Sequence, residues 1–255
     1  MLPSLSLHAL EEIPLIAPGD DLGAIIARSA RADGIGLETG DVVVVAQKIV
    51  SKAEGCYADL DAVEPRPLAL ELAAATGKDA HHLEWVLRES REVVRHGPGV
   101  VVAEHRLGFV MANAGIDESN ITQEAGRRRV LLLPRDPDAS CARLKRELDV
   151  AFSADVAVVM NDSFGRPWRN GVVGVAIGAA GIPALQDMAG QPDLFGRPLR
   201  ATEIAVADEL AAAASLLMGQ ANEGRPVVVV RGLRPLGPER PASALVRDKR
   251  RDLFR

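Results

Sequence analysis

The feature that most restricts the fold of this chain is a polar stretch between two apolar segments of strand length. Residues 154–160 read ADVAVVM, residues 172–178 read VVGVAIG, and residues 161–171 between them read NDSFGRPWRNG. Short apolar runs bounded by glycine and polar residues are typical of buried strands. The polar stretch carries a carboxylate, a hydroxyl and two arginines, which suit metal ions and phosphates. The sequence therefore predicts a strand that ends in a Gly-rich turn at the centre of an active site.

Further apolar runs predict a core built from both strands and helices. Valine-rich residues 42–46 and 226–232 suit strands buried on both faces. Strands and helices alternate irregularly, so we expect an α+β or mixed α/β fold with mixed sheets and flanking helices. No flexible linker divides the chain, so we expect one domain over 1–255 with a peripheral tail at 234–255. Helical spacing of alanine and leucine predicts helices at 22–31, 65–76, 79–89, 141–152 and 202–218.

Composition limits the function further. Thirty basic and thirty-five acidic residues give a formal net charge of −5, which argues against broad electrostatic binding to nucleic acid. Cys56 and Cys141 lie far apart and form no cluster, so neither a zinc site nor a disulfide framework is expected. No apolar run approaches the roughly 20 residues needed to cross a bilayer, and no signal peptide is recognisable. We expect a cytoplasmic protein that binds neither nucleic acid nor membrane.

A second polar region, residues 113–120, gathers oxygen donors that suit a hard divalent cation. Its sequence NAGIDESN holds two carboxylates, two carboxamides and a hydroxyl. A ligand-free Asx-rich turn is the alternative interpretation. Together with Asp162 and Ser163 and the cations of Lys52, Arg166 and Arg169, the region indicates metal-bridged phosphoryl transfer. Neither a GxxxxGK[ST] phosphate loop nor a GxGxxG fingerprint is present, so a nucleotide would have to bind in another way.

Two other polar segments allow both a functional and a structural interpretation. Gln47, Lys48 and Lys52 follow the predicted strand 42–46, where they are placed to reach a ligand beyond a sheet, but solvated lysines fit equally well. Residues 220–225 after the long C-terminal helix suit either a nucleotide or a plain helix-to-strand connection.

The two adjacent histidines, His81 and His82, lie in the first turn of the predicted helix 79–89. Neighbouring helical residues point in different directions, so they cannot form the i, i+4 pair that binds a metal ion. We therefore expect both histidines on the surface.

Several long segments, in the same order along the chain, resemble the coenzyme F420-0 gamma-glutamyl ligase family. The first are GDVVVVAQKIVSKAEG at 40–55, NAGID at 113–117 with SN at 119–120, LLP at 132–134 with DPD at 136–138, and DSFGRPWR at 162–169 with GVVG at 171–174. Later ones are Asp187, DL at 193–194, GR at 196–197, Leu199, ADE at 207–209, LLMG at 216–219 and VVRGL at 229–233. A set of motifs in order is far more specific than any single motif.

The resemblance implies a gamma-glutamyl-ligase-like fold and a homodimer that adds L-glutamate to the deazaflavin precursor coenzyme F420-0, with GTP as the second substrate. It also implies two divalent ions, Mg²⁺ or Mn²⁺, with K⁺ as a further candidate cofactor. Some relatives carry an additional flavin-binding domain, and we expect this chain to be the ligase module alone.

Carried over by position, the resemblance places the metal ions on Asp117, Asp162, Ser163 and Gln220. It implies that Asp117 and Asp162 are catalytic, with Lys52 and Arg166 as electrostatic partners. Gln220 replaces a metal-binding Glu, and Gln47-Lys48 stands where archaeal members have small hydroxyl residues. A neutral amide is a poorer ligand than a carboxylate, so the second metal site is expected to be weaker or to recruit Glu223. The implied GTP-binding residues are Ile13, Pro14, Leu15, Ile16, Gln47, Lys48, Lys52, Asn120, Met218, Gly219, Gln220, Ala221, Asn222, Glu223, Gly224 and Arg225.

The chemistry that follows from this resemblance is attack of a carboxylate on the γ-phosphate of GTP, followed by displacement of phosphate by the α-amine of glutamate. Later rounds would attach each glutamate through the side-chain carboxylate of the previous one. Two alternatives stay open at the level of sequence. One is a ligase of the same fold with a different carboxylate acceptor or amino acid, and the other is a GTP-binding subunit that has lost its chemistry, which Gln220 motivates.

Overall fold

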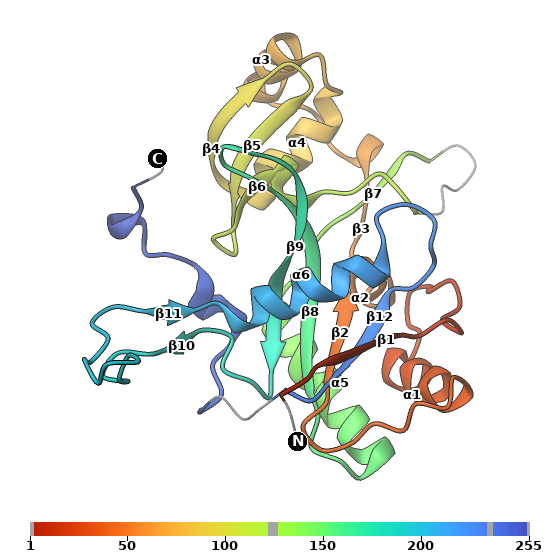
Figure 1. Ribbon diagram of the computed structural model, residues 1–255. Helices are drawn as coiled ribbons and strands as arrows, with labels where there is room; N and C mark the ends of the chain where they lie inside the picture. The colour runs from red at the N-terminus through yellow and green to blue at the C-terminus, as the bar shows by residue number, and fades with distance from the viewer. Residues whose placement is uncertain (1–2, 122–126, 234–236, 254–255) are drawn as a thin grey trace.

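The structure is a computed structural model that describes residues 3–121, 127–233 and 237–253. Its largest sheet has five strands in the order β1-β12-β2-β8-β9 (Figure 1). β2 and β8 run parallel, whereas the other neighbouring pairs are antiparallel. This mixed sheet with flanking helices confirms the predicted fold class. Its strands are β1 (Ser6–Ala9), β2 (Val42–Ala46), β8 (Ala157–Arg166), β9 (Arg169–Ala180) and β12 (Val227–Arg231).

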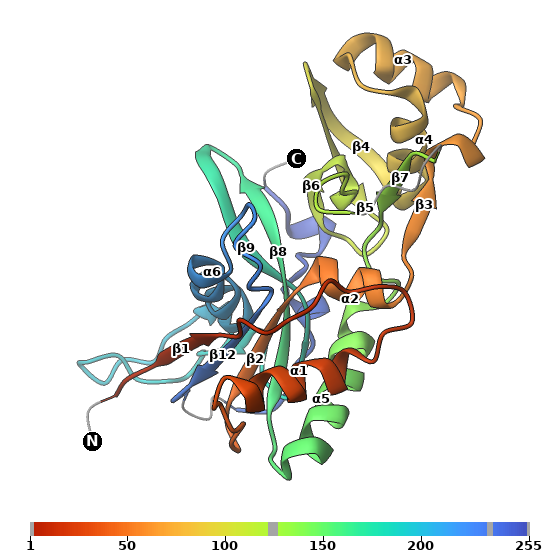
Figure 2. The ribbon, with the colours of Figure 1, turned by 90° about the vertical axis from the view of Figure 1, so that its right-hand side faces the viewer.

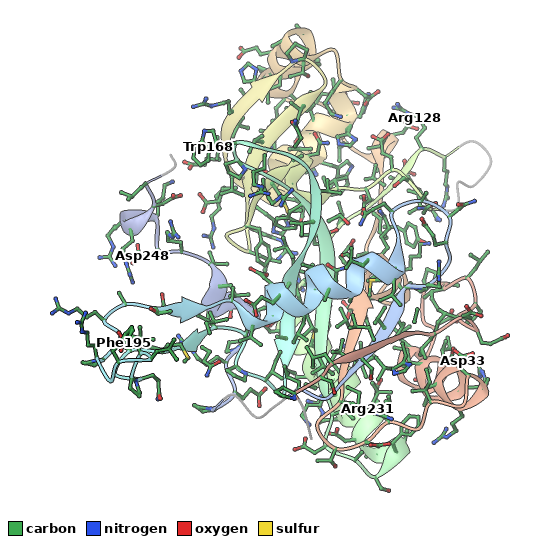
Figure 3. All side chains as sticks on the ribbon, viewed as in Figure 1. Asp33, Arg128, Trp168, Phe195, Arg231 and Asp248 are labelled. Atoms are coloured by element: carbon green, nitrogen blue, oxygen red, sulfur yellow. The ribbon has the colours of Figure 1, made fainter. Side chains whose placement is uncertain are left out.

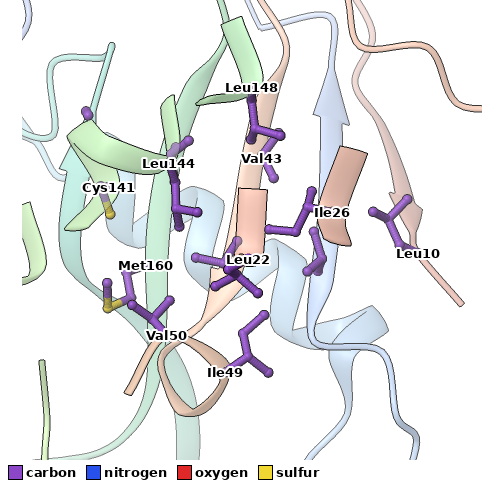
Figure 4. Close-up of a cluster of buried hydrophobic side chains, with 14 of the residues drawn as sticks. Leu10, Leu22, Ile26, Val43, Ile49, Val50, Cys141, Leu144, Leu148 and Met160 are labelled. Atoms are coloured by element: carbon purple, nitrogen blue, oxygen red, sulfur yellow. The ribbon is translucent and has the colours of Figure 1, made fainter. Parts of the chain in front are cut away.

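Helices cover both faces of the central sheet. α1 (Leu22–Ala32) and α5 (Pro137–Phe152) lie on one side, and α6 (Val206–Met218) lies on the other (Figure 2). Val43 of β2 packs in the core under α1 and α5, beside Ile26 and Leu144 (Figure 4), whereas Val44 packs under α6. Strand side chains alternate between faces, so β2 is apolar throughout because both of its faces are covered. Among the described residues, no helix has the length and apolar character needed to cross a bilayer.

A second lobe is inserted between α2 (Gln47–Ala53) and α5, and stands at the top of Figure 1. It contains a three-stranded sheet, β4-β5-β6, and a two-stranded sheet, β3-β7. Its own core includes Leu72, Leu83, Val101 and Ile116. The chain therefore leaves the central sheet after β2 and returns at β8 with a separately packed body between them. The elements of this lobe are β3 (Tyr57–Asp59), α3 (Pro67–Thr76), α4 (Ala80–Glu89), β4 (Ser90–Gly97), β5 (Val100–His105), β6 (Val110–Ala112) and β7 (Arg129–Leu131).

Two segments lie outside these bodies. β10 (Gln186–Asp187) and β11 (Glu203–Ile204) form the base of an arm, and Phe195 lies near its outer end (Figure 3). Phe195 is 86% exposed. Residues 237–253 are mostly exposed, but Ala242 among them is fully buried and its backbone N–H donates to Oδ1 of Asp138 at 2.8 Å, which attaches this segment to the rest of the chain.

The polar stretch 161–171 does not form the Gly-rich turn that we expected. β8 continues through it to Arg166 and pairs with β9 in a long hairpin. The connecting turn is short, and Trp168 within it adopts a left-handed φ of 56°. Pairing with the valine-rich start of β9 overrides the low strand propensity of Asn, Asp, Ser and Gly. Asp162 and Ser163 are therefore presented by a paired strand and not by a loop.

Candidate active site

A cavity of about 540 Å³ opens where β2 ends beside the middle of β8. The register of these parallel strands sets Ala46 beside Asn161, so α2 begins next to Asp162 and Ser163, which β8 carries past the end of β2. Residues 13–16 and the segment 218–226 after α6 form other parts of the wall. The predicted site residues that line the cavity are Ile13, Pro14, Leu15, Ile16, Gln47, Lys48, Lys52, Asn120, Asp162, Ser163, Met218, Gly219, Gln220, Ala221, Asn222, Glu223, Gly224 and Arg225.

Asp117 belongs to the inserted lobe and faces the start of α2. Its backbone N–H and C=O pair with Leu131 at 3.0 and 2.9 Å, which fixes the peptide against β7. Its Oδ1 lies 3.2 Å from Nζ of Lys48, and the two side chains are only 25% and 31% exposed. This ion pair joins the inserted lobe to the helix that follows β2.

Asp162 lies on β8 within the electrostatic field of Asp117. Burial, and secondarily the charge of Asp117, raise the pKa of Asp162 from its ordinary value of 3.8 to about 7. Burial also raises the pKa of Asp117, although the ammonium group of Lys48 opposes this effect. Burial therefore disfavours the ionised form of both carboxyl groups, and a cation bound beside them would favour it again.

Ser163 is directed away from Asp162, because neighbouring residues of a strand point to opposite faces. Its Oγ donates a hydrogen bond of 2.9 Å to Oε1 of Gln220, in the loop after α6. The predicted metal donors therefore form two groups. Asp117 and Asp162 lie on one side of β8, and Ser163 and Gln220 lie on the other.

Asn120 connects three walls of the cavity. Nζ of Lys52 on α2 donates to the backbone oxygen of Asn120 at 2.6 Å, and Nδ2 of Asn120 donates to the backbone oxygen of Ala221 at 3.2 Å. Burial, and secondarily the neighbouring charge of Lys48, lower the pKa of Lys52. The contacts tie α2, the inserted lobe and the loop after α6 together around the cavity.

Glu223 is engaged within its own loop. Its Oε2 accepts a hydrogen bond of 2.8 Å from the backbone N–H of Ala221, and such backbone donors lower the pKa of Glu223. The carboxylate packs over Gly219, where an added Cβ would lie 2.1 Å from Cδ of Glu223. Glu223 would have to exchange these hydrogen bonds to serve as the metal ligand that the sequence suggested.

Arg166 does not line the cavity. It closes β8 near the tip of the hairpin, and its Nη2 donates to the backbone oxygen of Asn170 at 3.0 Å. Its Nε is buried with no hydrogen-bond partner among the described residues. The cations beside the two aspartates are Lys48 and Lys52.

The donor set fits a divalent ion that arrives with a phosphate-bearing substrate. Within the described residues, no three side chains of His, Cys, Asp or Glu gather into a complete metal cage. Mg²⁺ is commonly held by one or two carboxylates, with substrate phosphates and water supplying the other oxygens. Asp117 and Asp162 match that requirement, and the oxygens of Ser163 and Gln220 are neutral donors on the opposite side of β8.

Sequence reasoning missed two residues that shape this site. Asn161 lines the cavity, is 5% exposed, and donates from Nδ2 to Oγ of Ser215 at 3.1 Å, which ties β8 to α6. A polar residue at the end of an apolar run was the available signal.

His82 was wrongly expected on the surface: it is 3% exposed, and its Nδ1 contacts Oε1 of Glu118. Spacing alone gave no sign of this burial.

Comparison with known proteins matches residues 11–232 to the family model described as F420-0:Gamma-glutamyl ligase. A protein of Methanopyrus kandleri named Coenzyme F420:L-glutamate ligase is 48% identical, over 100% of this chain and 99% of its own length. Proteins of the same name from Methanothermobacter thermautotrophicus and Methanocaldococcus jannaschii are 46% and 41% identical, over 98% and 96% of this chain and 99% and 94% of their own lengths. With a family model that spans most of its residues and full-length relatives at this identity, the chain belongs to the F420-0:gamma-glutamyl ligase family.

Proposed function

We propose that this protein is a GTP-dependent ligase that joins L-glutamate to coenzyme F420-0. The observation that carries the proposal is the electrostatic coupling of Asp162, which lines the cavity together with Lys48 and Lys52, to Asp117 from the inserted lobe. The family and the names of the relatives supply the substrate class. Acidic residues with adjacent lysines are the groups that phosphoryl transfer requires.

The first step activates the acceptor. A carboxylate oxygen of F420-0 attacks the γ-phosphorus of GTP, and the bond from that phosphorus to the oxygen of the β-phosphate breaks. GDP leaves, and the carboxyl group becomes an acyl phosphate. The ammonium groups of Lys48 and Lys52 line the cavity and stabilise negative charge on the transferring phosphate.

The second step forms the amide. The uncharged α-amine of glutamate attacks the acyl carbon, inorganic phosphate leaves with its bonding electron pair, and the amine loses a proton. The side-chain carboxylate of the added glutamate is then the acceptor for another round. Asp117 and Asp162 would hold Mg²⁺ or Mn²⁺, which neutralises phosphate charge when bound.

The cavity offers different surfaces for the two ends of a nucleotide. Ile13, Leu15 and Met218 supply apolar contacts that suit the flat faces of guanine, and Leu15 is 93% exposed at the rim. Lys48 and Lys52 after β2, with a metal ion held by Asp162 of β8, suit the phosphates. We further propose that the protein works in the cytoplasm and forms a homodimer. Light scattering on the purified protein tests the dimer by its molar mass.

The direct test is an incubation of the purified protein with F420-0, GTP, glutamate and Mn²⁺. Mass spectrometry should show glutamyl addition, and one GDP should appear for each amide formed. An assay with ATP in place of GTP tests the choice of nucleotide, and a panel of other carboxylic acids tests the acceptor. If GTP binds and no GDP or glutamylated product forms in the complete mixture, the ligase proposal is wrong and a binding role replaces it.

A further inference from the structure

The first turn of α4 holds both ends of the segment between Asp117 and β7. Before the gap in the described residues, Glu118 contacts Nδ1 of His82. After it, Nη1 of Arg128 (labelled in Figure 3) donates to Oδ2 of Asp79 at 2.9 Å. Asp79 is the N-cap of α4, and its other carboxylate oxygen accepts the backbone N–H of His82 at 3.0 Å. The first turn of α4 therefore contacts Glu118, which follows Asp117, and Arg128, which precedes β7.

The two anchors differ in their surroundings. Arg128 and Asp79 are 48% and 42% exposed, and an ion pair so open to water contributes little. His82 is 3% exposed, whereas Glu118 is 59% exposed. A buried donor that leaves its partner loses a hydrogen bond that water cannot replace. The His82 contact is therefore the stronger restraint on the loop.

The hydrogen-bonding role of each nitrogen of His82 follows from its environment. Burial lowers the pKa of His82, and the charge of Glu118 opposes this effect. The neutral imidazole then donates Nδ1–H to the carboxylate of Glu118. Its Nε2 is buried with no hydrogen-bond partner among the described residues, so Glu118 is the contact that fixes the ring.

Residues on both sides of Glu118 reach the active site. Asp117 precedes it and pairs with Lys48 at 3.2 Å. Asn120 lies two positions later, where it accepts from Lys52 and donates to Ala221. A shift of Glu118 would move both of these contacts, because the peptide between them is short.

We propose that His82 is a positioning residue, which holds Glu118 and thereby sets the placement of Asp117 and Asn120 at the nucleotide and metal site. This inference deepens the proposed function and rests on it for the identity of the ligands. His82 acts through the loop and touches no substrate. Groups that orient the ligands of a metal in this indirect way typically change metal affinity by about 10- to 100-fold when removed.

Three variants test the proposal. His82→Phe keeps a ring in the buried site and removes the donor, whereas His82→Asn retains an amide nitrogen close to the position of Nδ1. Glu118→Ala removes the acceptor from an exposed side chain, so it leaves the core of the lobe intact even if His82→Phe fails to fold. His81→Phe is the matched control, because Nδ1 of His81 contacts the backbone oxygen of Val63 and not the loop.

The first readout needs neither substrate nor metal. Hydrogen exchange at the amide of Asp117, which donates to Leu131 in the structure, should be at least about tenfold faster in His82→Phe and Glu118→Ala. The amides of β8 should be unchanged. The second readout is direct binding of Mn²⁺ in the presence of GTP, which should weaken about tenfold in both variants and recover in His82→Asn.

The positioning role would be overturned if a folded His82→Phe or Glu118→Ala variant showed the same exchange rate at the Asp117 amide and the same Mn²⁺ affinity as the wild-type protein. The same result in His81→Phe as in His82→Phe would also overturn it, because the effect would then belong to α4 as a whole. Failure of the wild-type protein to add glutamate would instead count against the proposed function, while the exchange measurement would still decide the role of His82.

Discussion

Oδ1 of Asp117 lies 3.2 Å from Nζ of Lys48, across the boundary between the inserted lobe and the central sheet. The pair is partly buried, and Asp162 stands close enough that Asp117 raises its pKa. The ammonium groups of Lys48 and Lys52 near these carboxylates leave little positive charge over for a bound phosphate. A divalent ion, together with the lysines that follow β2, would neutralise the negative charge of a bound triphosphate.

Replacement of Asp162 by Asn should remove activity and preserve the fold. The amide retains an acceptor for the backbone N–H of Ser163, which donates to Oδ1 of Asp162 at 2.8 Å. We expect turnover to fall at least about 100-fold, because the carboxylate proposed to hold the metal ion is lost. Steady-state kinetics measure the loss, and circular dichroism checks the fold. Near-normal turnover in Asp162→Asn would remove Asp162 from the mechanism.

The metal-free protein should lose stability as the pH rises through the range in which Asp162 ionises. The folded state keeps a proton on Asp162 up to about pH 7, whereas the unfolded chain releases it near the ordinary value of 3.8. The folded state then binds more protons than the unfolded state, so the free energy of unfolding decreases with pH across this window. We expect a decrease of up to about 4 kcal/mol in urea titrations with EDTA. Asp162→Asn should lack this decrease; an equal slope in the variant would assign it to other groups.

Metal binding should show the opposite dependence on pH. The ion requires ionised Asp162, so Mn²⁺ affinity should rise up to about pH 7 and then level off. Removal of the lysine charge in Lys48→Met should move this midpoint to higher pH, because Lys48 lowers the pKa of both aspartates. Calorimetric titrations of Mn²⁺ binding between pH 5.5 and 8.5 measure this pH midpoint. A midpoint that is unmoved in Lys48→Met would contradict the electrostatic coupling.

Restoring a carboxylate at residue 220 should strengthen metal binding. The side-chain oxygen of Gln220 already accepts a hydrogen bond from Ser163, and Glu can accept the same bond. A carboxylate binds a hard dication better than an amide does, so we expect Gln220→Glu to tighten Mn²⁺ binding by about tenfold. Isothermal titration with GTP present tests this expectation. An unchanged affinity would place the ion on the Asp162 side of β8 alone.

The close approach of β9 to α5 should make Gly178 intolerant of a side chain. A Cβ there would lie 2.5 Å from the backbone oxygen of Pro137, which cannot move without shifting the start of the helix. We expect Gly178→Ala to lower the free energy of unfolding by about 1–3 kcal/mol. Gly36→Ala is the control, because no heavy atom lies within 4 Å of its added Cβ. Equal denaturation midpoints for the two variants would contradict the packing argument.

Local pattern was enough to predict a strand that is buried on both faces and a helix with one buried face. The valine run gave β2 at Val42–Ala46, and the helical spacing that predicted 79–89 corresponds to α4 at Ala80–Glu89. α5 begins at Pro137, four residues before the predicted start, because Asp136 caps the helix and proline is well suited to its first turn. Boundaries set by such caps are harder to predict than the apolar faces themselves.

The arrangement of the site depended on contacts that no local pattern contains. Asp162 and Ser163 were expected in a loop. Because β8 pairs with β9, they are instead neighbours on a strand, and their side chains point to opposite faces of the sheet. The burial of His82 depends on the packing of the inserted lobe around α4. The ion pair of Asp117 with Lys48 joins residues 69 positions apart. The resemblance assigned Asp117 to the metal ions and Lys48 to GTP, but it predicted no contact between the two side chains.

Because the inserted lobe carries Asp117 and the five-stranded sheet carries Asp162, the distance between the two carboxylates is also a measure of how the two bodies are oriented. Any displacement of one body against the other would change the repulsion between the two carboxylates. A cation bound to both would therefore tie the bodies together, and its affinity would depend on their relative position.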